Sequence, residues 1–163
     1  MNEITDALSS DINVITAEIN SYKQIAGNAI FEIGRRLKHV KENDLAHGEY
    51  IAWLRSIDMD KSQAAKFVKV YETFESEKVG TYTHLGLRAL YEIATLPPEA
   101  REQAHTIPST GEVKTVDEMT VRELREVKKA LKEAQEAASR AHKRAQKAEE
   151  AVGHAKRIFV ETC

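Results

Sequence analysis

Residues His47–Tyr71 read HGEYIAWLRSIDMDKSQAAKFVKVY, and this stretch decides the fold. Its pattern predicts a short apolar helix, a polar break at Asp58–Asp60, and a second amphipathic helix that begins near Lys61. A short helix, a tight corner and a longer helix are the layout of a helix-turn-helix, whose second helix enters the DNA major groove. We therefore predict a helix-turn-helix over about residues 48–74.

The residues of the break support this layout. Asp58 stands where such a corner commonly needs a left-handed backbone, which Asp tolerates better than most residues other than glycine. Asp60 and Gln63 have the spacing of a capping box. In that motif the Asp60 carboxylate accepts from the first free amides of the second helix, and Gln63 reaches back.

Apolar side chains at three- and four-residue spacing predict how the two helices pack. A stripe on the second helix is expected to bury against the first helix, with Met59 filling the corner between them. The expected contact joins Ala64, Phe67, Val68 and Tyr71 to Trp53, Leu54 and Ile57.

The opposite face of the second helix carries no acidic residue between Lys61 and Tyr71. Gln and Lys bond base edges, Ser bonds bases or phosphates, and an Ala methyl contacts a thymine methyl. The second helix would therefore read the groove, while Lys69 and Arg55 would hold phosphates. The predicted DNA-contacting residues are Arg55, Lys61, Ser62, Gln63, Ala65, Lys66 and Lys69. The alternative is an ordinary helical hairpin with a solvent-exposed lysine face.

The elements IGRRLKHVKE, HGEYIAWL and DKSQAAKFVKVY, within about residues 30–71, resemble a family of proteins of unknown function. This family is encoded by phages, plasmids and other mobile elements of Firmicutes. Compared with that family, this chain has Asp58 in place of the usual glycine and Asp60 in place of the capping serine. Ala64 and Phe67 stand where the family has an alanine and, three residues later, an aromatic residue. LGLRALYEIATLPPEAREQA and PSTGEVKTVDEMTVRELREVKKAL look similar to the same proteins. The resemblance implies a DNA-binding regulatory role.

A long amphipathic helix is predicted before this stretch, from Ile4 to Val40, either unbroken or bent at Gly27 or Gly34. Such a helix needs a surface to lie against, which is either the later helices or a dimer seam. Its end is basic, and there two interpretations stay open: favourable pairing with the helix dipole, or phosphate contact beside the second helix. The residues concerned are Arg35, Arg36, Lys38, His39 and Lys41.

After a polar loop that follows Phe74, we predict one helix over about residues 84–95 and a second over PPEAREQAH, which Pro97 and Pro98 begin. Residues 107–116 hold a turn signal and a short extended piece. Thr120 and Glu123 form another capping box, which starts the last helix.

The last helix carries an apolar residue at alternating steps of three and four, a heptad pattern that favours a coiled coil. Most of these residues are alanines, so the seam would be thin. A single solvent-exposed helix, stabilised by charge pairs four residues apart, is the alternative. The seam consists of Leu124, Val127, Leu131, Ala134, Ala138, Ala141, Ala145, Ala148, Val152, Ala155 and Phe159.

The composition excludes several classes of protein. The formal net charge of −2 means that any basic surface must be local. The single cysteine, Cys163, rules out an internal disulfide framework, and the polar start and short apolar runs predict a cytoplasmic protein without a membrane span. The six histidines are scattered singly, and no catalytic, cofactor-binding or metal-ligand spacing occurs. We expect neither an enzyme nor a cofactor or metal.

We therefore predict an all-α protein with three parts. Residues 1–106 would form a helical DNA-binding domain, 107–119 a linker, and 120–163 a coiled-coil helix for dimerisation or partner binding. The predicted function is sequence-specific binding of double-stranded DNA, as a homodimeric repressor-type regulator of a phage or mobile element. Two alternatives remain: an interaction protein that inhibits or titrates a host or phage protein through its long helices, and a partition or replication accessory.

Overall fold

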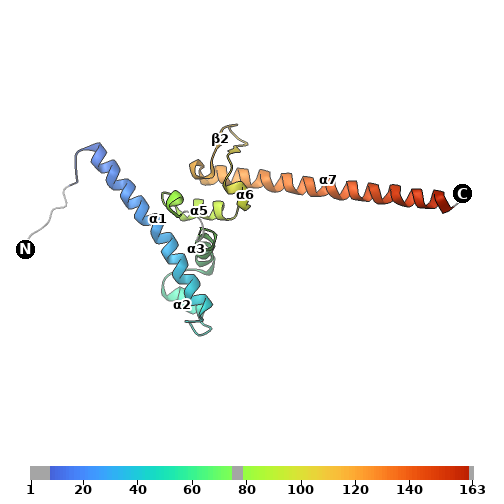
Figure 1. The fold of residues 1–163 in the computed structure, drawn as a ribbon. Helices are drawn as coiled ribbons and strands as arrows, with labels where there is room; N and C mark the ends of the chain where they lie inside the picture. Colours follow the sequence, from blue (N-terminus) through green and yellow to red (C-terminus); the bar gives the residue numbers. More distant parts are fainter. Residues whose placement is uncertain (1–7, 75–78, 162–163) are drawn as a thin grey trace, which may run out of the picture.

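The computed structural model describes residues 8–74 and 79–161, which are mostly helical, so the expected all-α class is confirmed (Figure 1). The helices are α1 (Ile12–Glu42), α2 (Tyr50–Ser56), α3 (Lys61–Phe74), α4 (Val79–Tyr82), α5 (Leu87–Ala94), α6 (Pro98–Arg101) and α7 (Val121–Glu161). Strands β1 (His105–Thr106) and β2 (Val113–Lys114) pair antiparallel, and the 3-10 turn η1 (Val116–Glu118) leads into α7.

The predicted first helix corresponds to α1, which begins later than expected because Asp11 caps it. The Asp11 carboxylate accepts from the backbone N–H of Asn13 at 2.8 Å. Ile4, where the sequence pattern starts, lies outside the described residues. The helix then runs without interruption through Gly27 and Gly34 to Glu42, so it is one helix and not two.

The two glycines of α1 allow close packing instead. A Cβ atom built on Gly34 would lie 2.3 Å from the backbone oxygen of Phe67 in α3, and one on Gly27 would lie 1.8 Å from that of Thr83. Real Cβ atoms do not approach so closely. Each glycine therefore brings the backbone of α1 against another segment, and Gly34 fixes the contact between α1 and α3.

Two groups of buried side chains form the core. The smaller group joins α1, α2 and α3 around Leu37, Leu54, Ala64 and Phe67. The larger group joins α3 and α5 to the start of α7, and it also takes in the segment between α6 and α7. Its fully buried members include Val70, Phe74, Leu90, Ile93, Ile107, Val116 and Leu124. Residues 107–119, which the sequence marks as a linker, thus contribute apolar side chains to this core.

The elements between α3 and α7 differ in detail from the prediction. The part of the predicted loop that is described contains α4, and α5 begins three residues later than expected, at Leu87. The reason is a turn, in which the Leu85 N–H donates to the carbonyl of Tyr82 at 3.0 Å and Gly86 takes an extended conformation as the N-cap. The helix predicted over PPEAREQAH ends at Arg101, before β1.

A charged network holds α7 to α5. The Glu92 side chain, which is 10% exposed, accepts from Arg125 Nε at 2.8 Å and from Lys128 Nζ at 3.2 Å, and Lys128 also donates to Thr95 Oγ1 at 2.6 Å. Burial opposes ionisation of Glu92, but the hydrogen bonds from the two cations outweigh it and lower the pKa of the carboxyl. The network fixes the first turns of α7 on the body.

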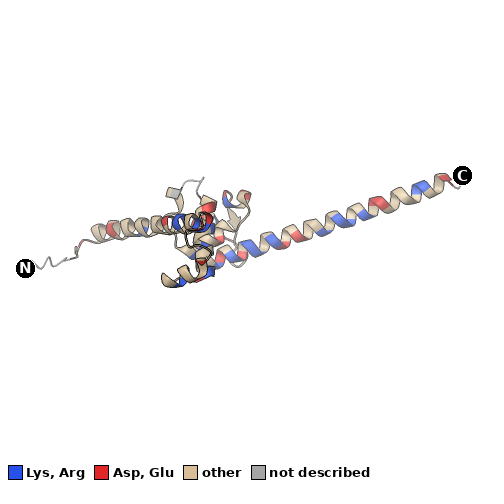
Figure 2. Ribbon diagram, turned by 90° about the horizontal axis from the view of Figure 1, so that it is seen from below, with Lys and Arg blue, Asp and Glu red and all other residues tan. Residues whose placement is uncertain are grey.

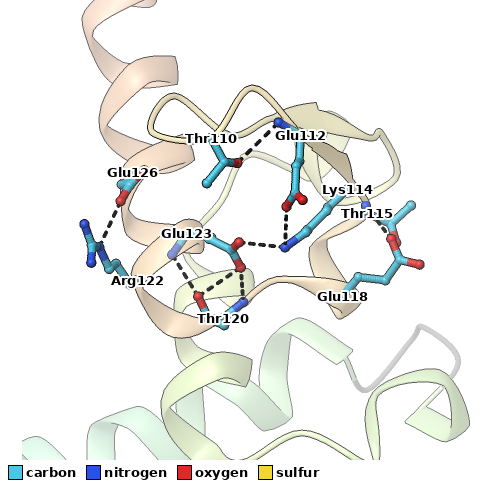
Figure 3. A network of polar contacts seen from close by, with 9 residues as sticks. All are labelled: Thr110, Glu112, Lys114, Thr115, Glu118, Thr120, Arg122, Glu123 and Glu126. Atoms are coloured by element: carbon cyan, nitrogen blue, oxygen red, sulfur yellow. Dashed lines mark hydrogen bonds and ion pairs between the residues drawn. The ribbon is translucent and has the colours of Figure 1, made fainter.

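The predicted capping box at the start of α7 is confirmed (Figure 3). The Thr120 N–H donates to Glu123 Oε2 at 2.7 Å, and the Glu123 N–H donates to Thr120 Oγ1 at 3.3 Å. Lys114, from β2, donates to the other carboxylate oxygen of Glu123 at 2.7 Å. These bonds lower the pKa of Glu123 to about 2, and the bond from Lys114 has the largest effect. One carboxylate therefore ties the strand pair to the cap of α7.

Two helical segments project from the body in different directions (Figure 1). In α7 the last residue partly buried against the core is Leu131, and every described residue from Lys132 onward is exposed except Gly153. In α1 no residue before Gly27 is buried. The long C-terminal helix expected from the heptad pattern is present, whereas its pairing with a second helix stays a prediction.

Gly34→Ala is expected to destabilise the protein by about 1–3 kcal/mol, because the added methyl group must push α1 away from the Phe67 backbone. Chemical denaturation followed by the fluorescence of Trp53 would measure the change. Gly153→Ala is the matched control, since nothing lies within 4 Å of the added atom and alanine favours a helix. Equal stability of the Gly34→Ala protein and the parent would contradict the close contact.

The free energy of unfolding should depend on pH through Glu123. Its folded pKa, about 2, lies below the ordinary value of 4.5. The stabilisation is therefore present above pH 4.5 and is lost as the pH falls from there toward 2. Urea titrations across this range should show a smaller loss for Glu123→Gln than for the parent, and Glu150→Gln, on the exposed part of α7, should behave as the parent does. If the free energy of unfolding fell equally with pH in the parent and in Glu123→Gln, the prediction would be contradicted.

Candidate nucleic-acid interface

The corner between α2 and α3 has the predicted geometry. Asp58 has a φ of 55°, the left-handed conformation expected for it. The N–H of Met59 donates to the carbonyl of Leu54 at 3.0 Å, which closes the end of α2. Asp60 Oδ1 accepts from the N–H of Gln63 at 2.7 Å, so the Asp cap is confirmed. Among the described residues, the return bond from the Gln63 side chain to Asp60 is absent.

The buried face of α3 was predicted in part. Ala64 and Phe67 are buried, and Val68 and Tyr71 are half-buried. Val70 and Phe74, which were not predicted, are fully buried because α3 also packs against α5.

The α2 side of the contact also differs from the prediction. Leu54 is buried and Trp53 is half-buried, but Ile57 is 45% exposed, so its expected burial is wrong. Met59 packs against the smaller core group at the corner, as predicted. Ile57 follows the last residue of α2 as its C-cap, where the chain turns away before it could cover α3.

The residues predicted to contact DNA lie mostly on the outer surface of the corner and of α3. Arg55, from α2, joins Lys61 and Gln63 along one open depression of about 510 Å³, which Ile51 and Asp58–Asp60 complete. The remaining residues follow the exposed side of α3. The exposed members of the predicted set are Arg55, Lys61, Ser62, Gln63, Ala65 and Lys69.

Lys66 is the exception, because it is half-buried. Its Nζ atom lies 5.9 Å from the centre of the Tyr91 ring of α5, a cation–π contact. No sequence pattern signals this contact, since the two residues are far apart in the chain and the pairing depends on how α5 packs on α3. Lys66 is therefore oriented by Tyr91, while its neighbours on α3 extend into solvent.

The basic end of α1 lies beside α3 and forms a second depression, of about 410 Å³, lined by Arg35, Arg36, Lys38, His39, Glu42 and Tyr71. Acidic neighbours partly neutralise it. Lys38 Nζ lies 3.7 Å from Glu72 of α3 and 3.8 Å from Glu42. Glu32 pairs with Arg36 and with Arg35, and these contacts, the hydrogen bond from Arg36 above all, lower the pKa of Glu32.

This pairing favours a structural role for the basic end of α1 over phosphate contact. Lys38 in particular connects α1 to α3 through Glu72 and lies 5.8 Å from the centre of the Tyr71 ring. Basic side chains of the corner and of the outer side of α3 extend into solvent instead. Figure 2 shows basic and acidic residues interspersed along α7.

Within the described residues, no group of three or more His, Cys, Asp or Glu side chains is arranged to hold a metal ion. None of the described helices combines the length and the apolar character needed to cross a bilayer.

The fold and the corner define a class: a helical protein with a helix-turn-helix-shaped pair, α2 and α3, on a body from which two long helices project. The chain belongs to the family described as Protein of unknown function (DUF3102), whose model matches residues 6–134. The match covers the whole body and stops just after Leu131, where α7 leaves the core. No curated protein and no solved structure matches the chain.

The left-handed corner makes a specific prediction. Asp58→Gly should leave stability unchanged or raise it slightly, because glycine adopts a positive φ without strain. Asp58→Val should lower the free energy of unfolding by about 1–2 kcal/mol, since a β-branched residue is strained there. Denaturant titration of both variants gives the two values, and a more stable Asp58→Val protein would be incompatible with this backbone conformation.

Proposed function

We propose that this protein is a sequence-specific DNA-binding regulator, and that α3 is its recognition helix. The observation that carries the proposal is the exposed start of α3. Lys61, Ser62 and Gln63 extend into solvent beside a left-handed, Asp-capped corner. A recognition helix presents its first residues to base edges in the same way.

The chemistry of this surface matches that of a groove-reading helix. Gln63 can bond the edge of an adenine with both its amide atoms, and Ser62 and Lys61 can donate to acceptors on bases. Lys69, further along the exposed side of α3, and Arg55, near the end of α2, are both exposed and would hold phosphates.

The proposal also includes the finer points that the sequence suggests. The protein would act as a homodimer on a two-fold operator, as a repressor encoded by a phage or another mobile element, in the cytoplasm. A two-fold dimer doubles the reading surface and fixes the spacing of the half-sites. With a net charge of −2 for the whole chain, attraction to DNA would come from this local surface alone.

A second candidate, a protein that binds and inhibits a host or phage protein, is favoured by one observation. The distal part of α7 is exposed along nearly all of its described length from Lys132. DNA binding requires the exposed side chains of α3, whereas inhibition of a partner through α7 does not. An inhibitor that uses α7 would not retard DNA in a gel, and its partner would no longer bind when the distal part of α7 is altered.

Substitutions on α3 should separate base reading from phosphate binding. Gln63→Ala is expected to relax the base preference at one position of each half-site, at a cost of about 1–3 kcal/mol for the preferred base. Lys69→Ala should weaken binding to all DNA sites alike. It should also reduce the slope of log K against log salt by about 0.9 for each phosphate that the side chain no longer neutralises.

The measurement is a series of gel shifts or anisotropy titrations on DNA that flanks the protein's own gene, at several salt concentrations. Lys129→Ala is the matched control, because Lys129 lies on the exposed side of α7 and pairs with Glu133. Absence of any DNA binding by the parent at micromolar concentration would refute the proposal, as would a full loss of binding in the control.

A further inference from the structure

The N-terminal half of α1 carries a row of large apolar side chains, most of which are exposed. Ile12 and Tyr22 are each 71% exposed, and Ile19 is 54% exposed. The half-buried Ile15 completes the row. Figure 1 shows this half of α1 extending away from the other helices, and Figure 2 shows that it bears few charges. Contiguous apolar surface of this kind marks an interaction site.

The row follows a heptad. With Ile12 and Ile19 at positions a, and Ile15 and Tyr22 at positions d, the steps alternate between three and four residues. Ala26, Ala29 and Ile33 continue the pattern, and Ile33 is still 37% exposed. The residues that α1 buries in its own body are Gly27, Phe31, Gly34 and Leu37, which occupy positions b, e and f. The seam and the body contact are thus different faces of one helix, so both can be occupied together.

The composition of this half of α1 gives it a low intrinsic preference for a helix. Residues 12–26 read INVITAEINSYKQIA, in which β-branched residues, Asn, Ser and Tyr outnumber strong helix formers. A segment of this length and composition is a marginal helix in water unless its apolar face is buried. The exposed part of α7 is the opposite case, because Ala, Glu, Lys, Arg and Gln predominate there and favour a helix without a partner.

Two charges beside the row are complementary to those of a second copy of the same chain. Glu18 falls at position g and Lys23 at position e of the next heptad, and neither makes an ion pair among the described residues. In a parallel pair of helices, g of one chain faces the following e of the other, so Glu18 and Lys23 would form two symmetric ion pairs.

An antiparallel pair lacks this complementarity. It places g opposite g and e opposite e, so Glu18 would meet another acidic residue (Asp11, Glu18 or Glu32) or Ile25, and Lys23 would meet another Lys23 or an uncharged residue. Registers that place like charges opposite one another are destabilised, and the other registers form no ion pair.

We propose that the protein dimerises through a parallel two-stranded coiled coil formed by the N-terminal half of α1, with Ile12, Ile15, Ile19 and Tyr22 in the seam. The two bodies then lie at the same end of the seam, related by a two-fold axis along it. This inference goes beyond DNA binding and does not depend on it. It places the dimer contact in α1, whereas the heptad of α7 had suggested the C-terminal helix.

The first experiment measures the oligomeric state of the full chain by sedimentation equilibrium. The parent should be a dimer at micromolar concentration, and Ile19→Asp should raise the dissociation constant roughly a hundredfold or more, because each dimer would bury two carboxylates in the seam. Ile19 is outside the core, so the thermal unfolding of the body gives an independent check that the variant folds.

Two matched variants locate the contact. Val14→Asp introduces the same charge at an exposed position c of the same helix, away from the seam, and should remain dimeric. Ala141→Asp introduces it at a d position of α7 and should also remain dimeric. A monomeric parent, or a dimer that Ala141→Asp dissociates and Ile19→Asp does not, would overturn the proposal.

The orientation of the helices has its own test. Glu18→Lys and Lys23→Glu should each weaken the dimer, since each places like charges opposite one another, and the double variant should recover the parent's dissociation constant. Oxidation of an Ile19→Cys, Cys163→Ser chain should link the two copies, because position a faces itself in a parallel pair, while Val14→Cys, Cys163→Ser should stay unlinked. Failure of both the recovery and the cross-link would rule out the parallel arrangement.

Discussion

The contact between the backbones of α1 and α3 is the constraint on which the rest of the structure depends. Gly34 lets the two helices approach until a methyl group no longer fits, and Leu37, Ala64 and Phe67 then close the smaller core group around it. The position of α3 on α1 decides which of its faces is buried. The proposed reading surface is therefore exposed because the other side of α3 is packed against neighbouring helices. The polarity of the lysines alone does not determine which side of α3 is exposed.

The corner depends on the same contact but is built from local chemistry. The left-handed Asp58 and the cap from Asp60 turn the chain within a few residues, so α2 and α3 meet without a long loop. Such local features are encoded by neighbouring residues, and both could be predicted from the sequence. The capping box of Thr120 and Glu123 was predictable for the same reason, whereas the bond from Lys114 to Glu123 joins residues that no local pattern connects.

The sequence was less informative wherever a helix packs on more than one neighbour. The spacing of apolar residues on α3 predicted Ala64 and Phe67, but not Val70 and Phe74, which face a second partner in α5. The sequence also left the role of Gly27 and Gly34 open, because within a helix glycine is compatible with a bend and with close approach, and only the neighbouring backbone decides between them. The contact of Lys66 with Tyr91 likewise needed the placement of α5.

The two projecting helices show why a heptad pattern by itself does not locate an interface. In α7 the repeat is long and regular, but alanine buries little area and already favours the helix, so exposure costs little. In α1 the repeat is shorter, but isoleucine and tyrosine leave more apolar surface in water, and their neighbours do not favour a helix. The free energy gained on association is therefore larger per residue in α1. The charged α7, which the Glu92 network fixes to the body, is left available for a contact of a different kind.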